Sequence, residues 1–468
     1  MRLTVACVAA ALVVSAPAEA QMAKGSFAGT LEPAPGTKLR LVLHLQEAQE
    51  GGGLVGSLDS LDQGARGIAL SAIDLSADTL RFWVPAVGGS YEGKWDPAGN
   101  KWVGNWSQGG AGLPLAWTPL PTSTRPPLAA TKNWTMPSPA ALAEAAVANR
   151  PALALGVGTV DGSRIQTTVR GGAAHSASDA TRFEIGSITK VLTDLLLADM
   201  VVKGEVRLDQ PVRDLLPAGV LSDGGNRPIT LRDLATHYSG LPRLPSNLAP
   251  TDPSDPYADY GQAKLYAFLK SWSPDRKPGA MFEYSNLGVG LLGHALALKA
   301  GKPYEQLLTE RILLPLGMKD SDFSDRNLAV PHGPDGKATK AWKLSALAAA
   351  GGLRSTTADM TRFAAALLDP PAQLRAAVRM MLDHPLKPTQ DFSQIRLGLL
   401  TVPTSEGLLL NHDGGTGGMR SSLFLDQPRK RAVVVLSNSV GEPAPTAVAL
   451  EAIAGVKMPA PPAGSGQR

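Results

Sequence analysis

The sequence predicts two domains of different fold class: a small all-β, barrel-like domain, then a larger α/β (α+β) domain with an antiparallel sheet flanked by helices. Three observations support this division. Residues 21–119 contain only short strand patterns separated by turns, and residues 120–138 are rich in proline. Residues 139–457 have strand patterns at both ends and helical patterns between them. A chain of 468 residues is long enough for two or three domains.

The first 20 residues have the pattern of a secretory signal peptide. Arg2 gives a positive start, Leu3 to Val14 form an apolar stretch, and Ala18-Glu-Ala20 provides a small-x-small cleavage site. The apolar stretch is shorter than the roughly 18 residues that a spanning helix needs, so we expect cleavage rather than anchoring. The single cysteine, Cys7, lies inside this segment, which leaves the mature chain without a thiol. We expect a periplasmic or secreted bacterial protein.

Composition argues against nucleic-acid and membrane partners. The net charge is +4 and the pI about 9.0, but the basic residues are scattered and form no stripe with aromatic residues. No second apolar run is long enough to cross a membrane. No motif such as H-E-x-x-H predicts a metal site, and we expect no cofactor. The Pro/Gly-rich residues 458–468 are predicted to be a disordered tail.

Residues 21–119 show the two-residue period of half-buried strands, most clearly where Leu39, Leu41, Leu43 and Leu45 alternate with other residues. The predicted strands are Gly25–Leu31, Leu39–Leu45, Leu54–Asp59, Ile68–Asp74, Thr79–Val84, Ser90–Trp95, Lys101–Ser107 and Leu113–Thr118. This spacing is typical of an up-and-down barrel or a sandwich. Five tryptophans could line a ligand cavity, although we favour a core role: Trp83, Trp95, Trp102, Trp106 and Trp117. The stretch is loosely similar to a lipocalin-like module, which implies no activity.

Residues 139–457 begin with a helix that Ser138-Pro139 would start, because serine is a good N-cap and proline suits the first helical position. The runs Leu153–Val160 and Ile165–Arg170 flank Asp161-Gly162, a strong hairpin signal. Further strands and a last helix are predicted at Gly407–Asn411, Ser421–Leu425, Ala432–Leu436 and Ala444–Ala454. We expect one antiparallel sheet built from both ends of the domain, with about 200 mostly helical and loop residues inserted.

Ser187 and Lys190 form the only Ser-x-x-Lys pair of the chain and precede a predicted helix at Val191–Met200. Residues three apart on a helix share a face, with Cβ atoms about 5–6 Å apart, so the amine can reach the hydroxyl. A serine becomes a nucleophile only when a base takes its proton. The positive end of the helix dipole and burial would both lower the pKa of Lys190 and favour the neutral amine. Alone, the pair is also typical of an ordinary surface helix.

Two other segments complete a pattern: Tyr284-Ser-Asn286, and His412-Asp-Gly-Gly-Thr-Gly-Gly418 after a predicted strand. With Ser187-Ile-Thr-Lys190 they resemble the motifs of the serine β-lactamase and penicillin-binding-protein superfamily, most closely its class C-like branch. Flanking segments match as well, at Leu231–Pro242, Pro315–Lys319 and Ala350–Thr356. The resemblance covers about residues 140–456 and implies a β-lactamase-like fold there.

The resemblance also implies a serine hydrolase that works through an acyl-enzyme. Ser187 would be the nucleophile, and Lys190 would accept or relay its proton. Tyr284 would share that work and later activate water. A tyrosine must have its pKa lowered to act as a base near neutrality, and a nearby lysine ammonium would lower it.

The remaining motif residues would contact the substrate. Asn286 would bond the substrate amide or hold Lys190, although in isolation Tyr284 and Asn286 could be turn residues before a helix. His412 and Gly414 are predicted to bind substrate, and the backbone N–H groups of Ser187 and Gly415 would form the oxyanion hole. His412 replaces the lysine found in penicillin-recognising enzymes. An ordinary histidine is mostly neutral at pH 7 and would hold a carboxylate weakly.

Three functions follow from these patterns. We expect hydrolysis of an ester, amide or peptide bond in a small-molecule or peptide substrate. β-Lactamase or DD-peptidase (penicillin-binding) activity is the first alternative, which His412 makes less favoured. A non-catalytic binding or sensor protein that kept the fold is the second, against which the intact Ser187, Lys190 and Tyr284 argue.

Overall fold

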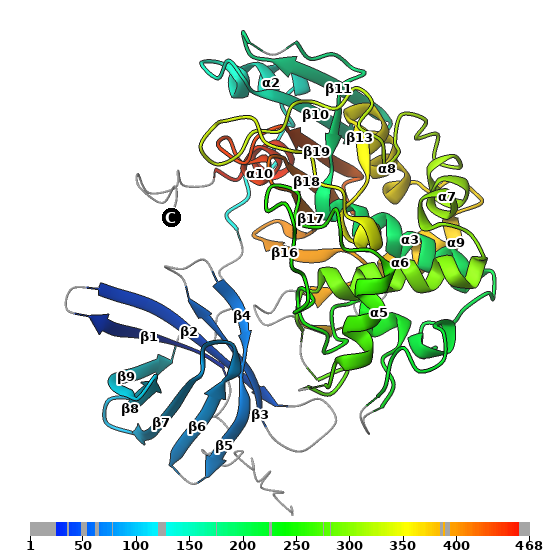
Figure 1. Ribbon diagram of the computed structural model, residues 1–468. Helices are drawn as coiled ribbons and strands as arrows, with labels where there is room; N and C mark the ends of the chain where they lie inside the picture. Colours follow the sequence, from blue (N-terminus) through cyan, green and yellow to red (C-terminus); the bar gives the residue numbers. More distant parts are fainter. Residues whose placement is uncertain are drawn as a thin grey trace, which may run out of the picture. The chain divides into compact units, whose positions relative to one another are not determined.

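The computed structural model describes residues 25–34, 37–47, 54–60, 65–76, 78–119, 128–174, 176–223, 227–274, 276–280, 282–383, 387–388 and 394–457. The predicted signal peptide, residues 120–127 of the predicted linker and the predicted tail lie outside the described residues. The chain divides after residue 122 into two compact units (Figure 1).

The first unit is one antiparallel sheet with the strand order β4-β3-β2-β1-β9-β8-β7-β6-β5. Its strands are β1 (Gly25–Ala34), β2 (Thr37–Glu47), β3 (Leu54–Ser60), β4 (Ala65–Ala69), β5 (Ser71–Ser76), β6 (Thr79–Val84), β7 (Gly89–Asp96), β8 (Lys101–Gln108) and β9 (Ala111–Pro119). The edge strands β4 and β5 are consecutive in the chain, so the sheet curls into a nearly closed barrel (Figure 1). This confirms the barrel-like expectation.

One predicted strand of this unit is wrong. The run from Ile68 to Asp74 is divided between β4, which pairs with β3, and β5, which pairs with β6. Ala72 has a left-handed φ of 48° and the register shifts between Ser71 and Asp74, so the chain bends where it passes from one edge to the other.

The barrel core contains most of the predicted tryptophans. Trp102, Trp106 and Trp117 are buried, and Trp117 packs edge-on against Tyr91 at 6.0 Å between ring centroids. Trp83 is 41% exposed, because it alternates with the inward-facing residues of β6, so the core assignment is wrong for this residue.

The second unit contains an antiparallel sheet with the order β11-β10-β19-β18-β17-β16-β15-β14. Its strands are β10 (Ala154–Asp161), β11 (Arg164–Gly171), β14 (Lys387–Pro388), β15 (Gln394–Ile395), β16 (Leu400–Thr404), β17 (Gly407–Gly415), β18 (Arg420–Asp426) and β19 (Arg431–Ser437). The hairpin β10–β11 joins the C-terminal strands through β10 and β19, with Leu155 opposite Ser437. The sheet is therefore built from both ends of the unit, as predicted.

Successive residues of β19 face two different cores. Val433 and Val435 pack with α2 (Pro139–Val147) and α10 (Pro445–Ala454), while Val434 and Leu436 join the larger core. The larger core includes α8 (Thr357–Leu368), which packs on β10 and β19. The sheet is thus covered by helices on both faces (Figure 1), and its central strands are almost continuously apolar for that reason.

The insertion between β11 and β16 is mostly helix and loop. Besides α8, its α-helices in the described residues are α3 (Thr189–Val202), α4 (Leu231–Ala235), α5 (Gln262–Ser271), α6 (Asn286–Ala300), α7 (Tyr304–Leu308) and α9 (Arg375–Asp383). Helix α3 is buried from Thr189 to Met200, so it lies at the centre of the helical region rather than on its surface.

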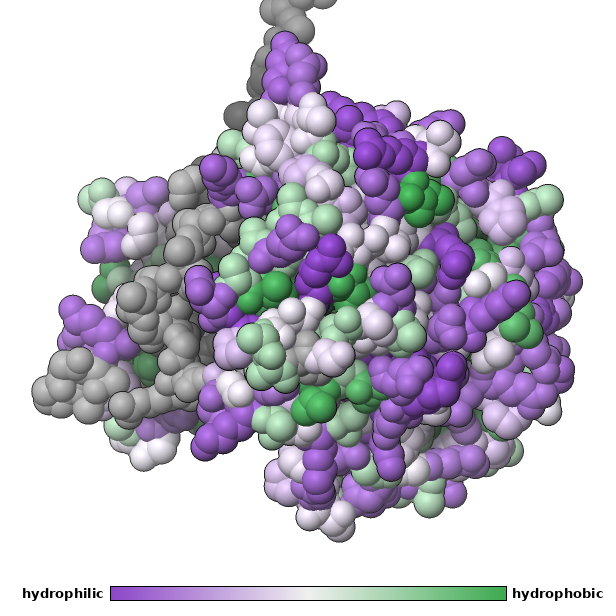
Figure 2. Space-filling model, turned by 90° about the horizontal axis from the view of Figure 1, so that it is seen from above, coloured by the Kyte–Doolittle hydropathy of each residue, from purple (hydrophilic) through white to green (hydrophobic). Residues whose placement is uncertain are grey.

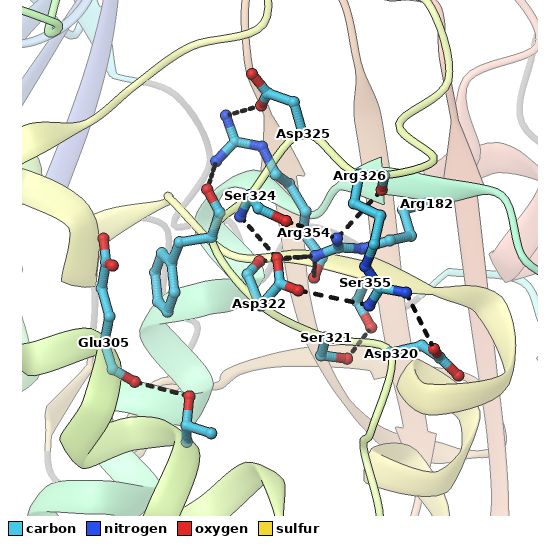
Figure 3. Close-up of polar contacts among 12 residues, drawn as sticks. Arg182, Glu305, Asp320, Ser321, Asp322, Ser324, Asp325, Arg326, Arg354 and Ser355 are labelled. Atoms are coloured by element: carbon cyan, nitrogen blue, oxygen red, sulfur yellow. Dashed lines mark hydrogen bonds and ion pairs between the residues drawn. The ribbon is translucent and has the colours of Figure 1, made fainter.

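A buried arginine holds the strand that leads to Ser187. Strand β12 (Arg182–Glu184) pairs with β13 (Arg354–Thr356), and the Arg182 side chain is fully buried. Its guanidinium binds the Asp322 carboxylate and donates to the carbonyl oxygens of Asp322, Arg326 and Arg354 (Figure 3). These bonds satisfy a charge that would otherwise be very unfavourable in the interior.

The face shown in Figure 2 is mainly hydrophilic, and hydrophobic residues occur on it in small separated groups. Within the described part of the chain, no helix is both long and apolar enough to span a membrane.

Candidate active site

Ser187 lies in the tight helical turn η2 (Gly186–Ile188) that leads directly into α3. Gly186 has a left-handed φ of 50°, and a Cβ atom there would collide with the backbone nitrogen of Gly415 on β17. Only glycine meets both conditions without strain. The serine turn and β17 therefore approach each other backbone to backbone, which brings the predicted oxyanion-hole residues Ser187 and Gly415 to the same place.

Lys190 is buried in the first turn of α3, with its Nζ 2.9 Å from Ser187 Oγ. The same nitrogen contacts Asn286 Oδ1 at 2.9 Å and the Ala350 carbonyl oxygen at 2.6 Å. Burial holds the pKa of Lys190 well below its usual range, Arg243 lowers it further, and Asp194 opposes the shift. The sequence-based expectation of a lowered lysine pKa agrees with this direction.

The three partners of Lys190 define how a neutral amine would be oriented. Asn286 Oδ1 and the Ala350 carbonyl can only accept, so they take the two N–H groups of the neutral amine. The nitrogen lone pair is then left for the third neighbour, the Ser187 hydroxyl. This arrangement can remove the serine proton without a change of side-chain position.

Tyr284 lies between Lys190 and His412. The Lys190 nitrogen is 4.8 Å from the centre of the tyrosine ring, and the phenol oxygen is 3.3 Å from His412 Nε2. Burial raises the pKa of Tyr284 to about 12, although hydrogen bonding to Ser187 and the Arg243 charge lower it. The expected lowering of the tyrosine pKa by a lysine ammonium is thus wrong, because burial acts on both groups and also favours the neutral lysine.

His412 is buried, with both ring nitrogens engaged. Nδ1 lies 2.7 Å from the Gly398 carbonyl oxygen, which can only accept, so Nδ1 carries the proton. In the neutral ring Nε2 then accepts from the Tyr284 hydroxyl. Burial lowers the pKa of His412 to about 3, and Lys190 acts in the same direction. The ordinary pKa assumed from the sequence is too high, and this histidine is uncharged throughout the neutral range.

Asn286 is the first residue of α6, and its side chain points to Lys190 rather than capping the helix. The cap is Ser285, whose hydroxyl accepts from the Gly288 N–H at 2.8 Å. His237 accepts at Nδ1 from the Ser285 N–H and packs on the Tyr284 ring at 4.4 Å between ring centroids. It therefore supports the segment that carries Tyr284. His294, further along α6, hydrogen-bonds to the Tyr266 hydroxyl.

The third motif packs against the serine turn. A Cβ atom at Gly414 would collide with the Ile185 carbonyl oxygen and the Ser421 hydroxyl, so this glycine permits contact between β17 and the segment before Ser187. Gly415 is exposed, whereas Gly414 is buried. Contact between Gly414 and a substrate stays a prediction.

Three further features of the site were not predicted from the sequence. The Ala350 and Gly398 carbonyl groups orient Lys190 and His412, but a backbone acceptor leaves no signal in a motif. Arg243 is exposed, and its guanidinium lies 5.2 Å from the Tyr284 ring centre. The usable signal in the sequence was an arginine in the loop before the predicted Tyr284 motif, because a cation there can approach the active site.

Within the described ranges, no group of three or more His, Cys, Asp or Glu side chains is arranged to hold a metal ion. The side chains that meet at the site are instead the hydroxyl of Ser187, the amine of Lys190, the amide of Asn286 and the phenol of Tyr284.

Comparison with known proteins adds to this geometry. Residues 140–457 match the family model described as Beta-lactamase. Over 185 residues the chain is 36% identical to the D-alanyl-D-alanine-carboxypeptidase/endopeptidase AmpH of Escherichia coli (strain K12), a match that spans 38% of this chain and 47%, about half, of that relative.

Two solved structures are similar. A β-lactamase/D-alanine carboxypeptidase from Yersinia pestis, complexed with citrate, is 25% identical with a TM-score of 0.57, over 64% of this chain and 92% of that one. A class C β-lactamase mutant is 20% identical with a TM-score of 0.58, over 69% of this chain and 99% of that one, and this likeness concerns the fold alone.

Proposed function

Because the chain belongs to the β-lactamase family, we propose that it is a serine hydrolase that cleaves an ester, amide or peptide bond through an acyl-enzyme on Ser187. The observation that carries this proposal is the orientation of Lys190. Its two acceptor partners leave the lone pair of the neutral amine for the Ser187 hydroxyl, 2.9 Å away.

In the acylation step, Ser187 Oγ bonds to the substrate carbonyl carbon as its proton passes to Lys190 Nζ. The developing oxyanion is bound by the N–H groups of Ser187 and Gly415. The Lys190 ammonium then gives its proton to the leaving group, directly or through the Tyr284 hydroxyl, and is a neutral amine again. In deacylation the oxygen of a water molecule bonds to the acyl carbon as a proton of that water passes to Lys190 Nζ; the Lys190 ammonium then gives this proton to Ser187 Oγ as the bond between Oγ and the acyl carbon breaks.

Tyr284 acts in this scheme as a neutral hydrogen-bonding relay rather than as a phenolate, since burial raises its pKa to about 12. His412 orients the relay by accepting from the phenol. As a neutral ring with both nitrogens engaged, it offers no positive charge to a substrate carboxylate. We therefore propose that efficient β-lactam hydrolysis is not the main activity.

A second candidate is D-alanyl-D-alanine carboxypeptidase activity, as in the name of the AmpH relative. Arg243 favours it. The exposed guanidinium lies over the Tyr284 ring and makes no ion pair with the described carboxylates, so its charge is available to the free carboxylate of a peptide.

The test compares hydrolysis of a short-chain p-nitrophenyl ester, a chromogenic cephalosporin and a D-alanyl-D-alanine peptide by the wild type and Ser187→Ala. We expect serine-dependent ester turnover with little cephalosporin turnover. Equal ester turnover by Ser187→Ala would refute the mechanism. Arg243→Gln separates the candidates, because a carboxypeptidase should lose peptide turnover about tenfold or more while ester turnover is retained.

We also propose that the protein is exported to the periplasm or secreted. The pattern of residues 1–20 and the absence of cysteine after Cys7 support this location. Fractionation of cells that express the full chain, with sequencing of the mature N-terminus, tests it: recovery of uncleaved protein in the cytoplasm would contradict export.

A further inference from the structure

A buried carboxyl group that the proposed mechanism does not use lies one helical turn from Lys190. Asp194 is fully buried on α3, and residues four apart on a helix lie on the same face. Neither of its carboxyl oxygens has a hydrogen-bond partner among the described residues. Such groups are rare in folded proteins because an unsatisfied buried carboxyl destabilises the fold, so each one needs an explanation.

Asp194 also contacts the segment that orients His412. A Cβ atom at Gly398 would lie 3.2 Å from Asp194 Oδ2 and 2.9 Å from the Val191 Cα, so the glycine backbone rests on this side of α3. The Gly398 carbonyl oxygen is the acceptor for His412 Nδ1. The carboxyl group therefore lies beside the support of the histidine, on the same face of α3 as the lysine.

We propose that Asp194 is a positioning residue for Lys190: the two side chains hold one proton between them in the resting enzyme and titrate as a coupled pair, so that ionisation of Asp194 makes the buried amine a stronger base toward the proton of Ser187. This inference rests on the proposed function. With one proton, the pair is either a neutral amine beside a carboxylic acid or an ammonium beside a carboxylate. Burial favours the first form, since it holds the pKa of Lys190 down and the pKa of Asp194 up.

The proton count in the reaction is simple. When Ser187 attacks, its O–H bond breaks and an N–H bond forms on Lys190, so the pair holds two protons, an ammonium and a carboxylic acid. When the ammonium protonates the leaving group, the pair returns to one proton. At higher pH the pair loses its last proton, and the Asp194 carboxylate then makes the Lys190 amine a stronger base.

Few other charged groups compete for this role. Tyr284 and Tyr304 face the same interior, and the Asp194 charge raises the pKa of both phenols. Arg243 acts on Lys190 from the open side of the site. Among the other elements that pack on α3, Arg311 is engaged by Asp199 and Glu205, His294 hydrogen-bonds to Tyr266, and the remaining charged residues are exposed. These exposed residues are Lys299, Glu305, Glu310, Arg375, Arg379 and Asp383.

The experiment measures the rate of Ser187 acylation by a fluorophosphonate across pH, together with the melting temperature, for wild type, Asp194→Asn and Asp194→Leu. The wild-type rate should rise with pH in two steps. Each variant should show one step and an upper plateau lower by a factor on the order of ten, because the carboxylate no longer strengthens the base. Asp194→Leu should melt at or above the wild-type temperature, since it removes an unpartnered carboxyl, whereas Asp194→Asn keeps an unpartnered polar group and should melt near the wild-type temperature.

Asp199→Asn is the matched control. Asp199 is buried on the same helix but is bound by Arg311 and Lys203, so its loss should lower the melting temperature and leave the shape of the pH profile unchanged. Profiles of both Asp194 variants that superimpose on the wild type would overturn the proposal, whatever the melting temperatures. Absence of any Ser187 labelling in the wild type would instead refute the proposed function itself, and this inference with it.

Discussion

The close approach of the serine turn to β17 gives the sharpest test of the oxyanion hole. Gly186→Ala introduces a Cβ at a residue with φ of 50°, where an L side chain is disfavoured by roughly 1–2 kcal/mol. The same Cβ would collide with the Gly415 nitrogen and lie 3.0 Å from the Gly415 carbonyl carbon and oxygen. The turn and the strand must therefore separate, which displaces one of the two proposed N–H donors. Losing one such donor typically lowers kcat by about 10²–10³.

Gly204→Ala is the matched control for that variant. Gly204, which follows α3, has a φ of 72°, but nothing lies within 4 Å of the Cβ that alanine would add. Gly204→Ala therefore carries the same backbone strain, about 2–4 °C in melting temperature for each kcal/mol, without the collision. Only Gly186→Ala should lose ester turnover. Wild-type kcat in Gly186→Ala, or an equal loss in Gly204→Ala, would refute the reasoning.

The other predictions concern the base, the relay and the buried arginine. The rate should rise with pH as Lys190 and Asp194 lose their protons, and His412, whose pKa of about 3 lies below the working range, should add no inflection; an inflection near pH 6.5 that remains beside the lysine step in Asp194→Leu would contradict the neutral histidine. Tyr284→Phe should lower kcat about 10²-fold with little change in the pH at which activity rises, because the residue relays rather than titrates, and stopped-flow acylation rates check this. Arg182→Met should destabilise the fold by about 3–5 kcal/mol in urea unfolding, since it leaves the Asp322 carboxylate and several carbonyls without their donor. The half-exposed Arg326, which also pairs with Asp322, provides the contrast: Arg326→Met should change stability by under about 1 kcal/mol.

Much of the fold could be predicted because strand periods and turn residues are local. The hairpin around Gly162 and the C-terminal strands each carry their own pattern, and the sheet follows from joining them. The break at Leu70 between β4 and β5 could not be predicted, since a continuous strand pattern does not reveal where the chain leaves one strand pair of the barrel and joins another. The short strands β14 to β16 were missed because their residues lack a clear alternation.

For the active site, the sequence identifies the residues but not the protonation states of their side chains. The spacing of the motifs identifies Ser187, Lys190 and Tyr284 as candidate catalytic residues, but it does not reveal how deeply each side chain is buried. Burial decides the protonation states: it lowers the pKa of Lys190 and raises that of Tyr284, so the expected phenolate becomes a phenol. The partners that orient these groups are largely backbone carbonyls, such as Ala350, which any residue type can supply.

The most direct test of the central claim is intact-protein mass spectrometry after brief incubation with an acylating ester, followed by peptide mapping. A single acyl group on the peptide that contains Ser187, absent from Ser187→Ala and lost again as product forms, is the predicted result. A wild-type protein that turns over the ester without acylation of Ser187, or that carries the label equally in Ser187→Ala, would contradict the account.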